Sequence, residues 1–191
     1  MNCRQLKTDH VIDFPEVRQS KNYTCGVSAL QAILYYYGIS YREDELETLL
    51  ATDPRSGTPP SAIVRLCRQL GLHVKEKHNM SIAQVKRSLR QKIPVLTVFQ
   101  AWGSKGSPEQ YATNDNGHYS VIIGIVEAAP GLGPAIIFED PLTIGKVYLK
   151  MDDFVHRWHD QDANGQLYQR YGIMISGPTA VYDSQLICEI E

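Results

Sequence analysis

Apolar residues in the first half of the chain recur mainly at the three- and four-residue spacing of helices. Residues 25–37 carry such a stripe, which includes Ala29 and Ile33, and Gly38 follows where a helix is expected to end. The same pattern predicts three further helices: one opened by a capping box at residues 40–43 and running through Leu50, one at residues 60–70 that begins at Pro59 and Pro60 and ends before Gly71, and one at residues 81–91.

The second half changes to short runs rich in β-branched and aromatic residues, which favour strands. These runs occupy residues 93–99, 118–126, 135–140, 146–150 and 167–176, and a short helical pattern lies at 152–159. Helices first and strands second predict an α+β fold, with a helical lobe packed on an antiparallel β-sheet and a cleft between them. We expect one domain, with the helical lobe at about residues 14–91, the β lobe at 92–176 and a tail at 177–191.

Composition and charge narrow the classes of function. The 191 residues are 43% hydrophobic and 21% charged, as in a soluble globular protein. A net charge of −2 without a basic stripe does not indicate nucleic acid or an anionic membrane as a partner. No run of 18 apolar residues predicts a membrane span, and the N-terminus lacks the apolar core of a signal peptide. We therefore expect a cytoplasmic protein, and no motif calls for a cofactor.

The four cysteines are scattered and form no CxxC pair, so the sequence indicates neither a zinc cluster nor a disulfide framework. Cys3 and Cys188 lie near the chain ends without evident partners. Cys67 lies on the apolar stripe of the helix at 60–70 and is predicted to be a small core residue.

Cys25 differs because it comes where a polar loop gives way to a helix. Thr24 is a good N-cap residue, which places Cys25 in the first turn. There the unpaired N–H groups and the positive end of the helix dipole favour a thiolate over a thiol. Cys25 is thus a candidate nucleophile, with a buried hydrophobic role as the alternative.

A catalytic thiol needs a base, usually a histidine that a carboxylate or amide orients. His118 follows the turn-like residues 114–117 and begins the most apolar strand. The strands at 118–126 and 135–140 should form a hairpin, and a symmetric one would pair Asp140 near Val121, about 10 Å along the strand from His118. A bulge or a register offset would bring Asp140 beside His118. The alternatives are a satisfied histidine at a sheet edge and a turn-forming aspartate before proline.

Gln19 lies six residues before Cys25 in the polar loop that leads into the helix. Its side-chain amide could donate to an oxyanion together with the backbone N–H of Cys25. An exposed loop glutamine without a function is the alternative.

These residues occur together in one known order. The chain resembles the C39 family of papain-like cysteine peptidases in Gln19, Thr24-Cys25-Gly26, Tyr36-Tyr37-Gly38, Ile93-Pro94-Val95-Leu96, Gly117-His118-Tyr119 and Glu139-Asp140-Pro141. The resemblance covers roughly residues 14–160. It implies the papain-like fold and acyl transfer through a thioester, with water as the usual acceptor and a peptide or protein as substrate. It also implies Cys25 as nucleophile, His118 as general base and then acid, Asp140 as its orienter and Gln19 as oxyanion donor.

Two features leave alternatives open. Leader peptidases of this family are often one domain of an export protein, and no transporter segment is present here, so cleavage of double-glycine leaders is not implied. The polar stretch between Phe99 and His118 contains Trp102, a candidate substrate contact if that stretch is a lid rather than a surface excursion. A same-fold acyltransferase and a non-catalytic peptide-binding module are the alternative functions.

A metal site at His156 and His159 is a further alternative, because two histidines three residues apart share one face of a helix. No third ligand has convincing spacing, so a solvated helix end is the preferred interpretation. The 11 tyrosines are interpreted as packing residues.

Overall fold

The computed structural model describes residues 11–102, 113, 116–127 and 133–187. Within them the helices are α1 (Cys25–Tyr36), α2 (Glu43–Leu49), α3 (Pro60–Gln69), α4 (Ile82–Arg90) and α5 (Met151–Arg157). The strands are β1 (His73–Lys77), β2 (Val95–Gln100), β3 (Gly117–Val126), β4 (Ala135–Glu139), β5 (Val147–Lys150), β6 (His159–Gln161), β7 (Leu167–Gln169) and β8 (Gly172–Ser176).

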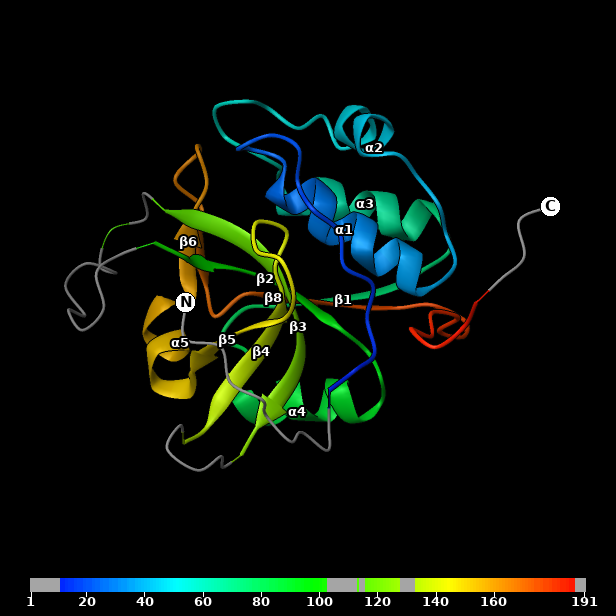
Figure 1. Cartoon of the computed structure of the whole chain (residues 1–191). Coiled ribbons are helices and arrows are strands. Elements are labelled where there is room, and N and C mark those ends of the chain that lie inside the picture. The colour runs from blue at the N-terminus through cyan, green and yellow to red at the C-terminus, as the bar shows by residue number, and fades with distance from the viewer. Residues whose placement is uncertain (1–10, 103–112, 114–115, 128–132, 188–191) are drawn as a thin grey trace.

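Six of these strands form one antiparallel sheet in the order β1-β8-β2-β3-β4-β5, and β6 pairs with β7 in a separate ribbon. In Figure 1 α1, α2 and α3 lie together above this sheet, and α4 and α5 lie below it. The predicted α+β architecture, a helical layer against an antiparallel sheet, is confirmed.

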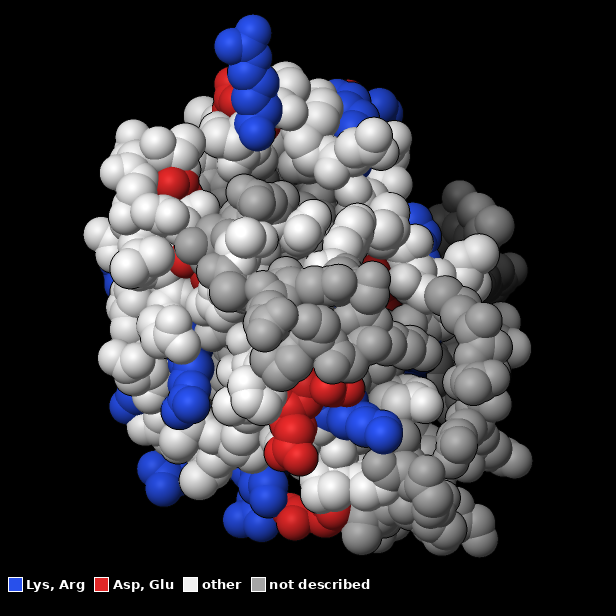
Figure 2. Space-filling view, turned by 90° about the vertical axis from the view of Figure 1, so that its left-hand side faces the viewer, with Lys and Arg blue, Asp and Glu red and all other residues white. Residues whose placement is uncertain are grey.

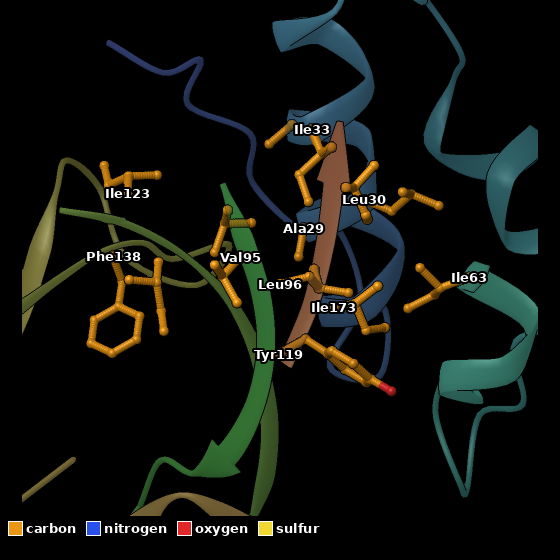
Figure 3. Packing of buried hydrophobic residues seen from close by; sticks show 14 of the residues in the cluster. Ala29, Leu30, Ile33, Ile63, Val95, Leu96, Tyr119, Ile123, Phe138 and Ile173 are labelled. Atoms are coloured by element: carbon orange, nitrogen blue, oxygen red, sulfur yellow. The ribbon is translucent and has the colours of Figure 1, made fainter. Parts of the chain in front are cut away.

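The interface between α1 and the sheet is the centre of the core. Ala29, Leu30 and Ile33 of α1 face Leu96 and Ile173 of the neighbouring strands β2 and β8, as Figure 3 shows. All five are almost fully buried. Burial of this size supplies the main favourable free energy of folding, so the sheet serves as a rigid support for the first turn of α1.

The predicted helix boundaries are confirmed for α1, α3 and α4, whose start and stop signals are local. Ser81 caps α4, since its hydroxyl accepts the N–H of Gln84 (3.3 Å). The capping box predicted at residues 40–43 is wrong by two positions. Arg42 is the N-cap residue of α2, and its N–H donates to the Glu45 carboxylate (2.9 Å). The Glu43 carboxylate instead accepts the N–H of Ser20 and the hydroxyl of Thr24.

The predicted strands need three corrections: two strands were missed, and one predicted strand is two. β1 and β6 were not predicted, because they are short and their polar residues show no strand periodicity; β1 is identified by its pairing with β8. The single strand predicted at 167–176 is two, β7 and β8, because Arg170 adopts a left-handed conformation (φ +44°) that breaks the extended chain. The helix expected at 152–159 is α5, which ends at Arg157.

The described surface carries charges of both signs. On the face shown in Figure 2, basic and acidic side chains are interspersed among uncharged residues. Within the described ranges, no helix has both the length and the apolar character needed to cross a membrane.

Candidate active site

The first turn of α1 carries Cys25 at the edge of the sheet. Thr24 holds the N-cap position, but its side chain does not cap the helix as predicted. Its hydroxyl lies 2.6 Å from the carboxylate of Glu43, which also accepts the N–H of Ser20 (3.0 Å). The hydroxyl thus donates to Glu43, and its oxygen accepts the N–H of Lys21 (3.3 Å) instead of an N–H in the first turn of α1.

Gly26 allows this turn to approach β3 closely. A Cβ atom at Gly26 would lie 2.9 Å from Cβ of Thr58 and 3.0 Å from a ring carbon of Tyr119. Tyr119 follows His118 on β3, and its hydroxyl donates to the carbonyl of Thr58 (3.0 Å). The missing side chain at position 26 therefore brings the helix that carries Cys25 against the strand that carries His118.

His118 and Asp140 are hydrogen-bonded to each other, with 2.8 Å between Nε2 and Oδ2. The register explains the contact: Val121 pairs with Glu139, and a bulge between Ile122 and Gly124 shifts the hairpin from the symmetric pairing. The register offset needed to bring Asp140 beside His118 is therefore present.

Asp140 is held by further donors on both oxygens. Ser120 donates its hydroxyl to Oδ2 (2.6 Å), and Leu142 donates its backbone N–H to Oδ1 (2.9 Å). Ser120 was missed in the sequence, although its position two residues after His118 on the same strand face was an available signal.

His118 and Asp140 shift each other's pKa. Burial alone would lower the pKa of His118, but its hydrogen bonds to Asp140 and to the thiol of Cys25 raise it to about 9. Burial would raise the pKa of Asp140, but the bond and charge of His118 and the Ser120 hydroxyl lower it to about 2. At neutral pH the pair is an imidazolium and a carboxylate, with Cys25 as the other partner of the imidazolium.

Gln19 lies beside Pro141, the residue after Asp140. Its backbone N–H donates to the carbonyl of Pro141 (2.9 Å), and its side-chain Nε2 donates to the carbonyl of Lys21 (2.8 Å). A primary amide nitrogen carries two hydrogens, so one remains for another acceptor.

Trp102 contacts His118 with ring centroids 4.8 Å apart and is 45% exposed. A pocket of about 340 Å³ lies beside it. Its walls include Phe99, Trp102, Phe138, Asp140, Leu142 and Val147. Residues 103–112, 114 and 115, which make up most of the predicted lid stretch, lie outside the described residues.

The structure brings together Cys25, His118 and Asp140, which lie in three separate motifs of the sequence. The sequence profile of the Peptidase_C39 like family matches residues 11–165. The chain belongs to this family.

Solved structures of C39 peptidases share its fold. A C39-like peptidase from Bacillus anthracis is 17% identical, with a TM-score of 0.64 over 88% of this chain and 98% of that one. The peptidase domain of Streptococcus ComA, a bifunctional ABC transporter of a quorum-sensing pathway, is 18% identical, with a TM-score of 0.59 over 85% and 97%. A double-glycine-motif protease from an AMS/PCAT transporter, in complex with the leader peptide, is 17% identical, with a TM-score of 0.57 over 88% and 94%. No curated protein is similar enough in sequence to match the chain.

The second described thiol in this family member has different surroundings. Cys67 is fully buried on α3, and burial raises the pKa of its thiol to about 12, whereas Cys25 is partly exposed. The core role predicted for Cys67 agrees with this position. Cys3 and Cys188 lie outside the described residues.

The metal alternative does not have the expected geometry. His156 lies on α5, but the helix ends at Arg157 and His159 belongs to β6, so the two do not share a helix face. Nδ1 of His156 is 2.7 Å from the carbonyl oxygen of Asp152. Among the described residues, no group of three or more potential ligands could hold a metal ion.

The His118 pair predicts a pH-dependent stability. Because the folded state raises the pKa of His118 from 6.5 to about 9, the imidazolium stabilises the fold fully below pH 6.5, and this stabilisation disappears as the pH rises through about 9. The difference in unfolding free energy between the wild type and His118→Ala should be larger at pH 6 than at pH 9.5 by about 2–3 kcal/mol. Urea titrations at the two pH values measure it.

The matched control is His73→Ala, which removes an exposed histidine of β1 and should give the same difference from the wild type at both pH values. A His118→Ala difference that does not change between pH 6 and 9.5 would contradict the ion pair.

Proposed function

We propose that the protein is a cysteine peptidase that hydrolyses a peptide bond through a thioester intermediate. Cys25 is the nucleophile, His118 the general acid and base, Asp140 its orienter, and Gln19 an oxyanion donor together with the backbone N–H of Cys25. The observation that carries the proposal is the His118–Asp140 hydrogen bond (2.8 Å), with Cys25 close enough to His118 to help raise the pKa of the imidazole; the three residues come from segments far apart in the sequence.

In acylation, the sulfur of Cys25 bonds to the carbonyl carbon of the substrate, and the carbonyl π electrons move to oxygen. The protonated His118 stabilises the thiolate by charge attraction before this step. Gln19 and the Cys25 N–H donate to the oxyanion. When the oxyanion collapses, the C–N bond breaks and the leaving nitrogen takes a proton from His118, which leaves a thioester and a free amine.

In deacylation, the now neutral His118 takes a proton from water as the water oxygen bonds to the thioester carbon. The second oxyanion collapses, the C–S bond breaks, and the acyl product leaves as a carboxylic acid. The thiolate and the imidazolium are then restored. Asp140 keeps the ring oriented in both directions through its bond to Nε2, which leaves the other ring nitrogen for Cys25.

The substrate of this activity is a peptide or protein segment. The fold is shared with a protease that binds a leader peptide. Trp102 supplies an exposed aromatic surface in contact with His118, and the apolar pocket beside it gives room for a side chain. We therefore assign Trp102 to substrate binding.

Labelling by iodoacetamide between pH 4 and 9, read at each cysteine by mass spectrometry, tests the thiol. We expect Cys25 to react well below pH 7 and to lose this reactivity in His118→Ala, whereas Cys67 stays unreactive as an internal control. A peptide library incubated with the wild type should yield cleaved products and identify the best substrate.

Other outcomes point to the alternatives. If Cys25 reacts only at alkaline pH, His118 makes no difference and no peptide is cleaved, the proposal is wrong and a peptide-binding module becomes the better interpretation. If products form only when an amine such as glycinamide is added, the protein is an acyltransferase.

A further inference from the structure

Three consecutive residues before α1 are bound to three consecutive residues at the end of β4. The N–H of Val17 donates to the Glu139 carboxylate (3.0 Å). Nη1 of Arg18 donates to the same carboxylate oxygen (2.7 Å) and to the carbonyl of Asp140 (3.0 Å). The N–H of Gln19 donates to the carbonyl of Pro141 (2.9 Å). The loop that leads to Cys25 is thereby joined to the loop that carries Asp140.

The centre of this junction is an ion pair whose carboxylate is buried and whose guanidinium is partly exposed. The side chain of Glu139 is 2% exposed and that of Arg18 is 29% exposed. Burial raises the pKa of Glu139, and Arg18 and the Val17 N–H oppose that rise. A buried carboxylate needs such donors because an uncompensated buried charge is strongly destabilising. Loss of Arg18 would therefore remove the countercharge of a buried carboxylate.

The junction constrains Gln19 more than it constrains the Asp140 side chain. Both carboxylate oxygens of Asp140 have their own donors in His118, Ser120 and Leu142, and the hydrogen bond of Arg18 to Asp140 goes to the backbone carbonyl of that residue. Gln19 is next to Arg18 in the chain, and within the described part of the chain its side-chain amide is hydrogen-bonded to the carbonyl of Lys21 alone. The loss of Arg18 would thus move Gln19 and leave the His118–Asp140 pair in place.

We propose that the Arg18–Glu139 ion pair positions the Gln19 amide for the oxyanion, so that Arg18 and Glu139 are positioning residues for the reaction. This inference rests on the proposed function. A displacement of about 1 Å at a positioned group can lower a rate by about 10²-fold. The pair acts on the oxyanion step and not on the nucleophilicity of Cys25.

The test compares hydrolysis of the best library peptide with alkylation of Cys25. Alkylation by iodoacetamide displaces iodide and forms no oxyanion, so it is insensitive to Gln19. We expect Arg18→Met to lower kcat by about 10–100-fold, and Gln19→Ala to lower it by about 10²–10³-fold. KM and the alkylation rate should change by less than about threefold in both variants.

The double variant Arg18→Met with Gln19→Ala tests whether Arg18 affects kcat through Gln19. If Arg18 acts through Gln19, the double variant should be no slower than Gln19→Ala alone, within about threefold. Multiplied losses would overturn the inference, as would a change in KM and alkylation with kcat unchanged.

Two further variants distinguish loss of the Arg18–Glu139 ion pair from a general effect of the substitution on the fold. Glu139→Gln keeps an oxygen that accepts from Val17 and Arg18 but removes the charge, and it should lower kcat by about 3–10-fold. Arg68→Met breaks the exposed ion pair with Glu76 (3.4 Å) and should leave kcat unchanged. An equal loss in Arg68→Met would overturn the inference, since arginine removal in general would then be the cause.

A failure of the proposed function would be recognised separately. N-acetylglycinal is a small aldehyde that is bound but not turned over. The sulfur of Cys25 adds to its carbonyl carbon, and the resulting oxygen lies where the Gln19 amide and the Cys25 N–H donate to the oxyanion of a substrate. If the wild type cleaves no peptide but binds the aldehyde, weaker binding by about tenfold or more in Arg18→Met and Gln19→Ala supports the inference, and equal binding overturns it. If the wild type does neither, the proposed function itself is wrong and the inference falls with it.

Discussion

Replacing Cys25 with alanine is expected to lower kcat/KM for peptide hydrolysis by at least about 10⁴-fold, because the variant lacks the sulfur that forms the thioester in the proposed mechanism. The side chain is small and only partly buried, so the fold should be retained. The measurement is the rate of cleavage of the best library peptide, with circular dichroism to show that the variant is folded.

Cys67→Ala is the matched control for this variant. It removes a thiol from the core, and it should lower the free energy of unfolding by about 0.5–3 kcal/mol while the folded protein keeps its kcat. Substantial hydrolysis by Cys25→Ala would mean that another group carries out the reaction and would contradict the assignment of the nucleophile.

Replacing Asp140 with alanine should have the second-largest effect, on stability as well as activity. His118 and the fully buried hydroxyl of Ser120 would both lose their partner, and the imidazole would no longer be held in position. Removal of one member of a buried ion pair costs about 3–5 kcal/mol of unfolding free energy. We expect kcat/KM to fall by about 10³–10⁴-fold, measured together with urea unfolding at pH 7.

Asp140→Asn separates the charge from the hydrogen bond. The amide oxygen can still accept from His118 and Ser120, so kcat should fall by only about 10–100-fold. Loss of the negative charge lowers the pKa of His118, so the alkaline limb of the pH–rate profile, near pH 9 in the wild type, should move to lower pH. Asp44→Asn, on the exposed part of α2, should leave the profile unchanged. An unshifted limb in Asp140→Asn would contradict the proposed role of the carboxylate.

The helices could be predicted from the sequence because their signals are local. Pro60 and Gly71 border α3, and Ser81 caps α4, within a few residues of the backbone groups that they satisfy. The Thr24 cap was wrong because its oxygen accepts the N–H of Lys21 on the loop side, while its O–H donates to Glu43, 19 residues away. The tertiary contact with Glu43 orients the hydroxyl, and the sequence around Thr24 does not show it.

The candidate site was predicted in its members but not in its geometry. Asp140 and His118 were expected at one edge of the sheet, and only the bulge in β3 decides that they touch. The bulge has a distant partner: the carbonyl of Ile123 accepts the N–H of Ile12 (2.8 Å). Gly124 leaves no room for a Cβ atom, which would lie 2.7 Å from the side chain of Val11. Gly124, a glycine inside an apolar strand, is a local sign of a bulge or a close approach, but the sequence does not show that residues 11 and 12 are its partners.

The sequence by itself determined the α+β class, the position of Cys25 at a helix start and the order of the proposed catalytic residues, because periodicity, caps and motifs are properties of neighbouring residues. The tertiary structure alone decided the pairing of β1 with β8, the contact between Asp140 and Ser120, and the Arg18–Glu139 ion pair. Arg18 and Glu139 are 121 positions apart, and each on its own looks like an ordinary charged residue. Contacts of this kind depend on how the lobes pack, and burial then determines which charges must be paired.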